Sequence, residues 1–250
     1  MIEVGYDNRL AATYFGRILE RFKPDVVHFF HLNRLGTGLI ELTVRAGIPA
    51  FMTPTDFWAI CPTMQLILCN GSLCRGPSAY AGNCVKHFAE STQNGLTGIL
   101  ARLLPTSLAD LLARLTQANV MPPYPHRVEV QAISSRLQVN IARLNQLNGI
   151  VAPNRFMSEK LVQHGISPHL IIQSAFGIDV VENAVSASRG SPRQPFRVGY
   201  IGTLVPHKGC HILIEAFKAL PRGRAILKIY GSTEDFPAYS SELKQLAAHQ

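Results

Sequence analysis

Short apolar runs that alternate with helical patterns are the feature that most restricts the fold of this chain. Residues 24–31, PDVVHFFH, are rich in β-branched and aromatic side chains, as expected of a buried parallel strand. A helix is expected over 37–46, closed by Gly47, and another strand over 48–53. The same order returns as a strand over 149–152, a helix that begins at Asn154 or Ser158 and ends before Gly165, and a strand over 170–174. This alternation predicts a parallel sheet in an α/β fold.

The region between the second and third of these strands is expected to be helical. Residues 94–119 are rich in leucine, and Pro105 interrupts them, with Thr106 and Ser107 as candidate N-caps of a second helix. Another helix is expected over about 126–147.

Near the C-terminus, residues 197–209 predict a strand, a glycine-bearing turn and a lysine at the start of a helix over 210–220. Gly199 and Gly202 allow close approach of a ligand to the backbone, and a helix N-terminus favours an anion. Lys208 adds a positive charge there. The spacing matches neither a P-loop nor a dinucleotide-binding fingerprint, so the segment indicates another kind of phosphate site. The plain alternative is a solvated lysine at an ordinary strand–helix turn.

Two unequal domains are expected. Residues 184–195, with serine, glycine, arginine and two prolines, have the composition of a linker. It separates a domain over 1–183 from a βαβα unit over 196–250, which is shorter than the roughly 100 residues of an ordinary doubly wound domain.

Several segments together resemble family 4 of the GT-B-fold glycosyltransferases. The resemblance rests on PDVVHFFH at 24–31, the stretch GIPAFMTPTDFWAICPTMQLILCNGSLCRGP from Gly47, NGIVAPNRFMSEKLVQHGI from Asn148, FGID at 176–179, the helix at 212–220 and LKIYG at 227–231. It implies two Rossmann-like, doubly wound domains with a cleft between them, the second incomplete here. The family's opening strand with its glycine-rich loop, and its acidic E-x7-E region, have no counterpart in this sequence.

The resemblance implies transfer of a sugar from a nucleotide-diphosphate sugar to a glycan, lipid-linked or small-molecule acceptor, with retention of configuration and without a bound metal. Lys208, with the backbone of Gly202, Thr203 and Gly209, would hold the diphosphate. Thr203 stands where the family has a second phosphate-binding arginine. Gly177 and Asp179 would shape the hinge between domains.

Candidate catalytic residues of the first domain are Asp56, His31 and Thr55. Thr55 and Asp56 follow a strand end, where open α/β sheets bind their ligands, and Thr55 replaces a histidine that contacts the donor sugar in many family members. His31 is expected to orient acceptor or sugar, whereas His28 is expected in the core. The single tryptophan, Trp58, suits core packing better than stacking on a sugar.

The segment from Cys61 to His87 has the pattern C-x7-C-x4-C-x9-C-x2-H, formed by Cys61, Cys69, Cys74, Cys84 and His87. Thiolates and an imidazole are typical zinc ligands, and a long loop with little apolar content needs a cross-link such as a metal ion to stabilise it. Zinc bound by Cys61, Cys74, Cys84 and His87 is therefore one prediction. Reduced, unbound thiols are the main alternative, and a disulfide is the third. Cys210 is expected to be buried in the second domain.

The net charge of +8 is spread along the chain without lysine or arginine runs, which argues against nucleic-acid binding. The first residues lack a secretory pattern, and no apolar run is long enough to cross a membrane, so a cytoplasmic protein is expected. Arg102 and Arg114 lie among the leucines of 94–119, which predicts peripheral contact with an anionic membrane such as the cytoplasmic face of the inner membrane. Core packing explains the same leucines.

Two alternatives to an active transferase remain open. The chain can be a non-catalytic GT-B remnant or binding module, because Thr55, Thr203 and the missing acidic region weaken a donor pocket. It can also be a zinc-stapled interaction protein organised by the cysteine segment.

Overall fold

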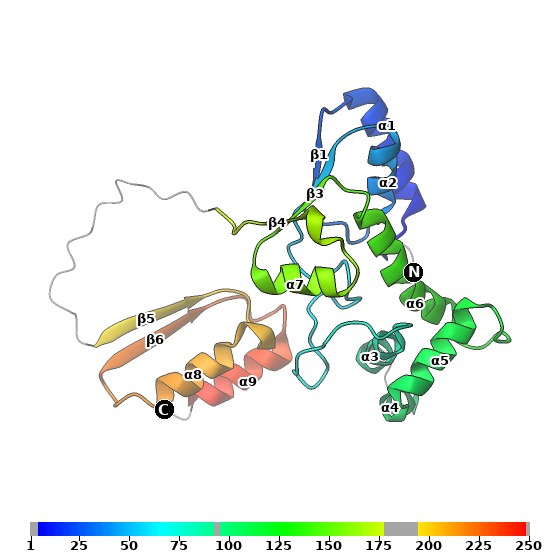
Figure 1. The fold of residues 1–250 in the computed structure, drawn as a ribbon. Coiled ribbons are helices and arrows are strands. Elements are labelled where there is room, and N and C mark those ends of the chain that lie inside the picture. The colour runs from blue at the N-terminus through cyan, green and yellow to red at the C-terminus, as the bar shows by residue number, and fades with distance from the viewer. Residues whose placement is uncertain (1–4, 93–95, 178–194, 249–250) are drawn as a thin grey trace. The chain divides into compact units, whose positions relative to one another are not determined.

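The computed structural model describes residues 5–92, 96–177 and 195–248 (Figure 1). The chain divides into two compact units, Met1–Ile178 and Asp179–Gln250, which we call the N-terminal and C-terminal units. Of the predicted linker over 184–195, all but Pro195 lies outside the described residues, as do the hinge candidate Asp179 and its neighbour Ile178.

The N-terminal unit contains a parallel sheet of four strands in the order β1-β2-β3-β4. Its elements are α1 (Arg9–Phe22), β1 (Val27–Phe29), α2 (Gly38–Arg45), β2 (Ala50–Met52), α3 (Gly82–Thr92), α4 (Leu96–Leu103), α5 (Thr106–Gln117), α6 (Arg127–Leu144), β3 (Gly149–Ala152), α7 (Arg155–Gln163) and β4 (Ile171–Gln173). The α/β class with a parallel sheet is thus confirmed. Within the described residues the strand order does not reverse, so a doubly wound arrangement stays a prediction.

Side chains alternate across this sheet, and one of its faces carries the core. Phe29, Met52 and Ile150 on that face are buried in one cluster with Ile40 of α2 and Leu161 of α7. The opposite face is open over several positions. His28, which pairs with Phe51, is exposed, and so is Ile172, which pairs with Val151. The strands are therefore covered on one side by helices and left accessible on the other.

The predicted elements around the strands are confirmed with shorter bounds. Asn154 caps α7, since its side-chain oxygen accepts the N–H of Met157 at 2.8 Å, and Gly165 follows with a φ of +105°. The prediction that Thr106 or Ser107 caps α5 is wrong, because Pro105 takes the N-cap position and no side chain caps the helix there. Both hydroxyl residues lie inside the first turn.

Two helices of the N-terminal unit were not predicted. Helix α1 exposes the apolar side chains of Leu10, Tyr14, Ile18 and Phe22 at intervals of four residues, while Phe15 packs near Phe29. Helix α3 replaces part of the expected cysteine loop. The start of α3 is held by a residue far away in the sequence, because Asp110 of α5 accepts the N–H groups of Tyr80 and Gly82.

The C-terminal unit confirms the expected βαβα order. It consists of β5 (Phe196–Ile201), a 3₁₀ turn (Pro206–Lys208), α8 (Cys210–Lys218), β6 (Ala225–Tyr230) and α9 (Pro237–Ala248). Strands β5 and β6 pair in parallel, and α8 and α9 lie side by side (Figure 1). The core is small: Leu204, Cys210, Ile214, Tyr239 and Leu243. Cys210 is fully buried, as predicted.

Candidate functional site

A histidine and a carboxylate meet where strands β1 and β2 end. His31 lies two residues after β1 and Asp56 four residues after β2, and the two parallel strands bring these carboxyl ends side by side. The Nε2 atom of His31 lies 2.9 Å from Oδ2 of Asp56, with 39% and 30% of the two side chains exposed. This edge of an open α/β sheet is where such folds bind ligands.

The contacts of His31 assign its tautomer. The backbone N–H of Asn33 donates to Nδ1 of His31 at 3.2 Å, so that nitrogen carries the lone pair. The proton of a neutral ring then lies on Nε2 and is donated to Asp56. Both ring nitrogens are thereby engaged, which orients the ring and makes the pair a fixed hydrogen-bonding unit.

The prediction that His28 belongs to the core is wrong. His28 lies on the face of the sheet opposite the buried Phe29 and is exposed. Its Nε2 atom lies 2.8 Å from Oγ1 of Thr53, and its ring stacks on Phe30 with centroids 4.7 Å apart. The strand ends at Phe29, so it does not continue to His31.

The loop that carries Asp56 is held in place by buried contacts. Oδ1 of Asp56 accepts the N–H of Trp58 at 2.7 Å, which closes a tight turn. Trp58 is buried, which supports core packing over stacking on a sugar. Asn140 of α6 donates to the carbonyl of Ala59 at 3.0 Å. Thr55 is exposed beside Asp56, so its hydroxyl is accessible.

Arg136 is the most unusual charged side chain near this loop. It is 4% exposed, its guanidinium donates to the carbonyls of Trp58 and Ala59, and its Cζ lies 5.0 Å from the centre of the Trp58 ring. Burial lowers the pKa of Arg136 to about 10, while the thiols of Cys61 and Cys84 act in the opposite direction. Within the described part of the chain, no carboxylate forms an ion pair with it.

Sequence reasoning missed Arg136 and Asn33. The signal for Arg136 is helical spacing: Ala132, Arg136 and Asn140 recur every four residues and are all buried. Asn33 acts through its backbone N–H, which no residue pattern reveals.

In the C-terminal unit, the predicted phosphate-binding residues lie between β5 and α8. Gly202 and Thr203 follow β5, and Lys208 ends the 3₁₀ turn with its side chain exposed. Gly209 follows as the N-cap of α8, with a φ of +71°. A Cβ atom at Gly231 would lie 2.3 Å from the carbonyl oxygen of Gly202, so the two backbone segments pass in close contact.

One N–H group at the start of α8 already has an acceptor. The hydroxyl of Tyr239 accepts the backbone N–H of His211 at 3.2 Å and also lies 2.6 Å from its Nδ1. An anion at this helix end would therefore depend on the remaining N–H groups and on Lys208.

The structure places the four zinc candidates around one small cavity. Cys61, Cys74, Cys84 and His87 are among its lining residues, whereas Cys69 is exposed and is not. The expectation that all of them lie in a loop is wrong for Cys84 and His87, which α3 presents one turn apart. All five cysteines are unpaired thiols. Burial raises the pKa of Cys84 to about 12, and the nearby thiols of Cys61 and Cys74 add to this. As they stand, the Cys, His, Asp and Glu side chains of the described ranges include no group of three arranged as ligands of one ion.

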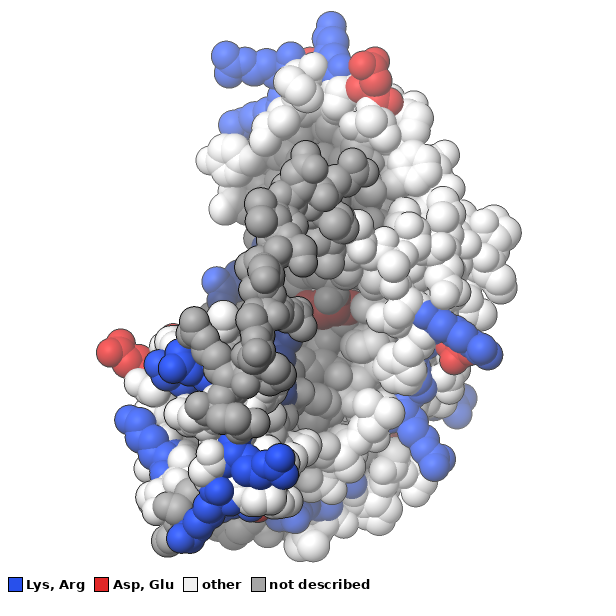
Figure 2. Space-filling model, turned by 90° about the vertical axis from the view of Figure 1, so that its left-hand side faces the viewer, with Lys and Arg blue, Asp and Glu red and all other residues white. Residues whose placement is uncertain are grey.

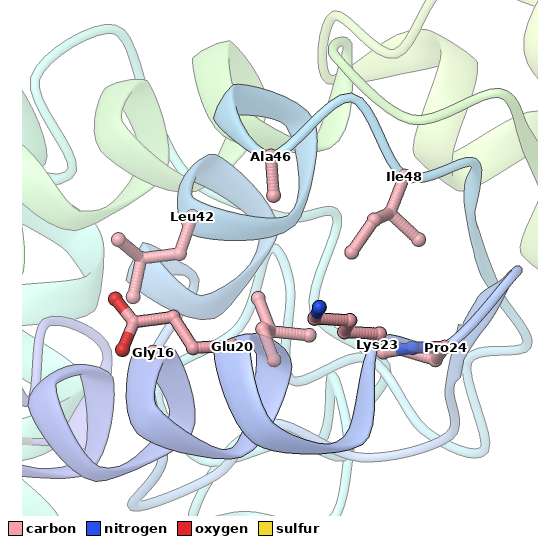
Figure 3. Close-up of a pocket in the computed structure, with 8 residues that line it drawn as sticks. Gly16, Glu20, Lys23, Pro24, Leu42, Ala46 and Ile48 are labelled. Atoms are coloured by element: carbon pink, nitrogen blue, oxygen red, sulfur yellow. The ribbon is translucent and has the colours of Figure 1, made fainter.

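A larger cavity of ≈ 360 Å³ lies between α1 and α2 (Figure 3). Gly16 and Glu20 of α1 line it opposite Leu42 and Ala46 of α2. Pro24 comes shortly before β1, so this cavity lies at the amino ends of the strands. It is separate from the His31–Asp56 pair at their carboxyl ends.

The helical region from α3 to α6 encloses an apolar cavity of ≈ 210 Å³ lined by residues that include Ala101, Leu112 and Val130. On the outer surface of this helical region, Ile99 and Leu103 of α4 and Leu108 and Leu111 of α5 are exposed. Arg102 pairs with Glu90 at 3.6 Å, and Arg114 lies over the ring of Tyr80. Core packing therefore leaves several large apolar side chains unexplained, and membrane contact stays a prediction.

On the face in Figure 2, Lys and Arg side chains lie at several separate places, with Asp and Glu side chains among them. No helix in the described ranges is both long and apolar enough to span a bilayer.

Comparison with protein-family models found no matching family, and comparison with curated proteins found no significant match.

Proposed function

We propose that this chain carries the core of a glycosyltransferase that moves a sugar from a nucleotide-diphosphate sugar to an acceptor. The observation that carries the proposal is the placement of the His31–Asp56 pair at the carboxyl ends of β1 and β2, the ligand-binding edge of an open parallel sheet. The reaction class, including retention of configuration and transfer without a bound metal, is what the resemblance of several segments to family 4 glycosyltransferases implies.

In this proposal, the N-terminal unit binds and orients the sugars. The carboxylate of Asp56 offers acceptors to a polyhydroxylated substrate, and the accessible hydroxyl of Thr55 offers a donor and an acceptor. Because Asn33 and Asp56 engage both ring nitrogens, we assign His31 a positioning role and not that of a free general base.

The C-terminal unit holds the diphosphate in this proposal. Departure of a nucleoside diphosphate builds negative charge, which a nearby cation and backbone N–H groups stabilise. Lys208 provides the cation, and the backbone of Gly202, Thr203 and Gly209 lines the same turn. Thr203 offers a hydroxyl in place of a second cation, so Lys208 is expected to dominate diphosphate binding.

The test is calorimetric titration of the full chain with UDP, GDP and ADP, followed by a transfer assay with the matching sugar nucleotides. Loss of one charge-assisted contact costs about 1.5–3 kcal/mol, so Lys208→Ala should weaken nucleotide binding by roughly 10- to 100-fold. Lys228→Ala is the matched control, because Lys228 is an exposed lysine on β6, and it should bind as the original chain does.

The Asp56→Asn variant tests the sugar site independently of the diphosphate site. An asparagine still accepts the N–H of Trp58 but presents an NH₂ group to His31 in place of an acceptor, unless the ring changes tautomer. Transfer should fall while nucleotide binding stays unchanged. A well-folded chain that binds none of the three nucleotides would contradict the proposal and favour a non-catalytic binding module.

A further inference from the structure

We infer that Cys61, Cys74, Cys84 and His87 form a structural zinc site, and that its net negative charge balances the buried guanidinium of Arg136. The inference is independent of the proposed transferase activity. It rests on the convergence of these four side chains, on the hydrogen bonding of Cys74 and on the charge of Arg136.

The first observation is convergence from separate parts of the chain. Cys61 follows the turn after Trp58, Cys74 lies in the following loop, and α3 supplies Cys84 and His87. On a helix, residues three apart lie on one face, so Cys84 and His87 can reach the same ion. All four line a cavity of ≈ 10 Å³, about the space of one water molecule.

The ligand set matches the chemistry of zinc. Three thiolates and one imidazole form a closed tetrahedral site, with Zn–S bonds of about 2.3 Å, which is typical of structural zinc. Side-chain rotation is needed to complete it, because the described side chains do not already form a group of three ligands.

The second observation concerns Cys74. The backbone N–H of Gly76 points at its sulfur, at 3.4 Å, two residues along the chain. Metal-bound ligands characteristically receive such supporting hydrogen bonds, which fix their orientation. Asn83 braces the same turn by donating to the carbonyl of Gly76 at 2.8 Å.

The third observation is the charge of Arg136. It is buried, and the described carboxylates form no ion pair with it, although a buried charge is costly unless it is paired. Three thiolates and a divalent cation leave one net negative charge. The guanidinium donates to the carbonyls of Trp58 and Ala59, three and two residues before Cys61, so the zinc site would lie close enough to provide the missing counter-charge.

The expected consequence is local. The ion would tie the loop after Cys61 to α3, and Cys61 lies five residues after Asp56. The site would thereby restrain the loop that carries the His31–Asp56 pair.

The test is metal analysis of the full chain, purified under reducing conditions, together with optical spectra after replacement of zinc by cobalt. We expect about one zinc per chain, and cobalt bands with thiolate charge transfer typical of a tetrahedral site. Cys74→Ser and Cys84→Ser should lose the metal. Cys69→Ser, in the same segment but exposed and outside the cavity, should keep it.

Two further measurements keep the result clear if a serine variant fails to fold. His87→Cys should retain zinc and strengthen the charge-transfer band, because a fourth thiolate replaces the imidazole. All five cysteines should titrate as free thiols in denaturant with chelator and without reductant. The inference is overturned if the original chain holds no zinc and gives no tetrahedral cobalt spectrum, if Cys69→Ser loses metal as fully as Cys84→Ser, or if only three thiols titrate, which would indicate a disulfide.

Discussion

The N-terminal and C-terminal units use the same strand–helix–strand arrangement but differ in how much core supports it. The N-terminal core joins α2, α6 and α7 to the first three strands of a four-stranded sheet. In the described part of the C-terminal unit, the core consists of five buried side chains beside a two-stranded sheet. A sheet of two strands has little stability of its own and depends on the helices that pack against it. The candidate diphosphate site is therefore built on the weaker unit.

Both sheets leave one face open, and the two open faces differ in how far their apolar side chains are exposed. On the open face of the C-terminal sheet, Ile201 is 86% exposed and Tyr230 is 54% exposed. On the open face of the N-terminal sheet, His28 and Ile172 of the outer strands are also exposed, but Phe51 and Val151 of the inner strands are half-buried. An inner strand has a neighbour on each side, which neither strand of the β5–β6 pair has.

The largest expected effect comes from truncating one core residue in each unit. Ile40→Ala, at a fully buried position, should destabilise the N-terminal unit by about 2–5 kcal/mol. Ile214→Ala removes a similar group from the five-residue core and should unfold the C-terminal unit alone. Hydrogen exchange of the amides in β5 and β6 should lose protection in Ile214→Ala and keep it in Ile40→Ala.

The alternative is that the two units unfold as one. If both variants lowered protection equally across β1–β4 and β5–β6, the separation into units of unequal stability would be wrong.

A smaller effect is expected where the two backbone segments of the C-terminal unit pass closely. Gly231→Ala would place its Cβ 2.3 Å from the Gly202 oxygen and 2.9 Å from a carbon of Leu204, so the chain must shift. We expect a loss of about 1–3 kcal/mol, as for overpacking of a tight contact, measured by denaturant unfolding. Gly199→Ala is the matched control in β5, because a Cβ there meets nothing within 4 Å. Equal stability of the two variants would show that the turn at Gly202 is not held by this contact.

The smallest expected effect concerns a helix cap. Asn154→Ala removes the side chain that accepts the N–H of Met157 and should cost about 1 kcal/mol in the stability of the N-terminal unit. Asn154→Ser retains a capping oxygen and should change the stability by a few tenths of a kcal/mol. Helix α8 begins at Cys210 and has Gly209 at its N-cap position, so no side chain caps it, which matches the weaker support of the C-terminal unit. If Asn154→Ala left the melting temperature unchanged, local capping would not contribute to the difference between the units.

The elements that the sequence predicted well are those with local causes. The strand at 149–152 and the helix that ends before Gly165 follow from a short apolar run, an asparagine cap and a glycine at positive φ. Helix α3 was missed because its start depends on Asp110, which lies nearly thirty residues further along the chain. Helix α1 had readable local signals, because its apolar residues gather on one half of the helix and Asn8 caps it by accepting the N–H of Ala11, so it could have been predicted from the sequence.

The sequence by itself determined the α/β class, the parallel pairing of the strands and the residue types available for chemistry, because these depend on local periodicity and turn residues. Tertiary structure decided which of those residues meet. It joined His31 to Asp56 across two strand ends, exposed His28, buried Arg136 behind Trp58 and gathered the cysteines and His87 around one cavity. Such contacts join segments that lie far apart along the chain, and they form only when the helices pack on the sheet.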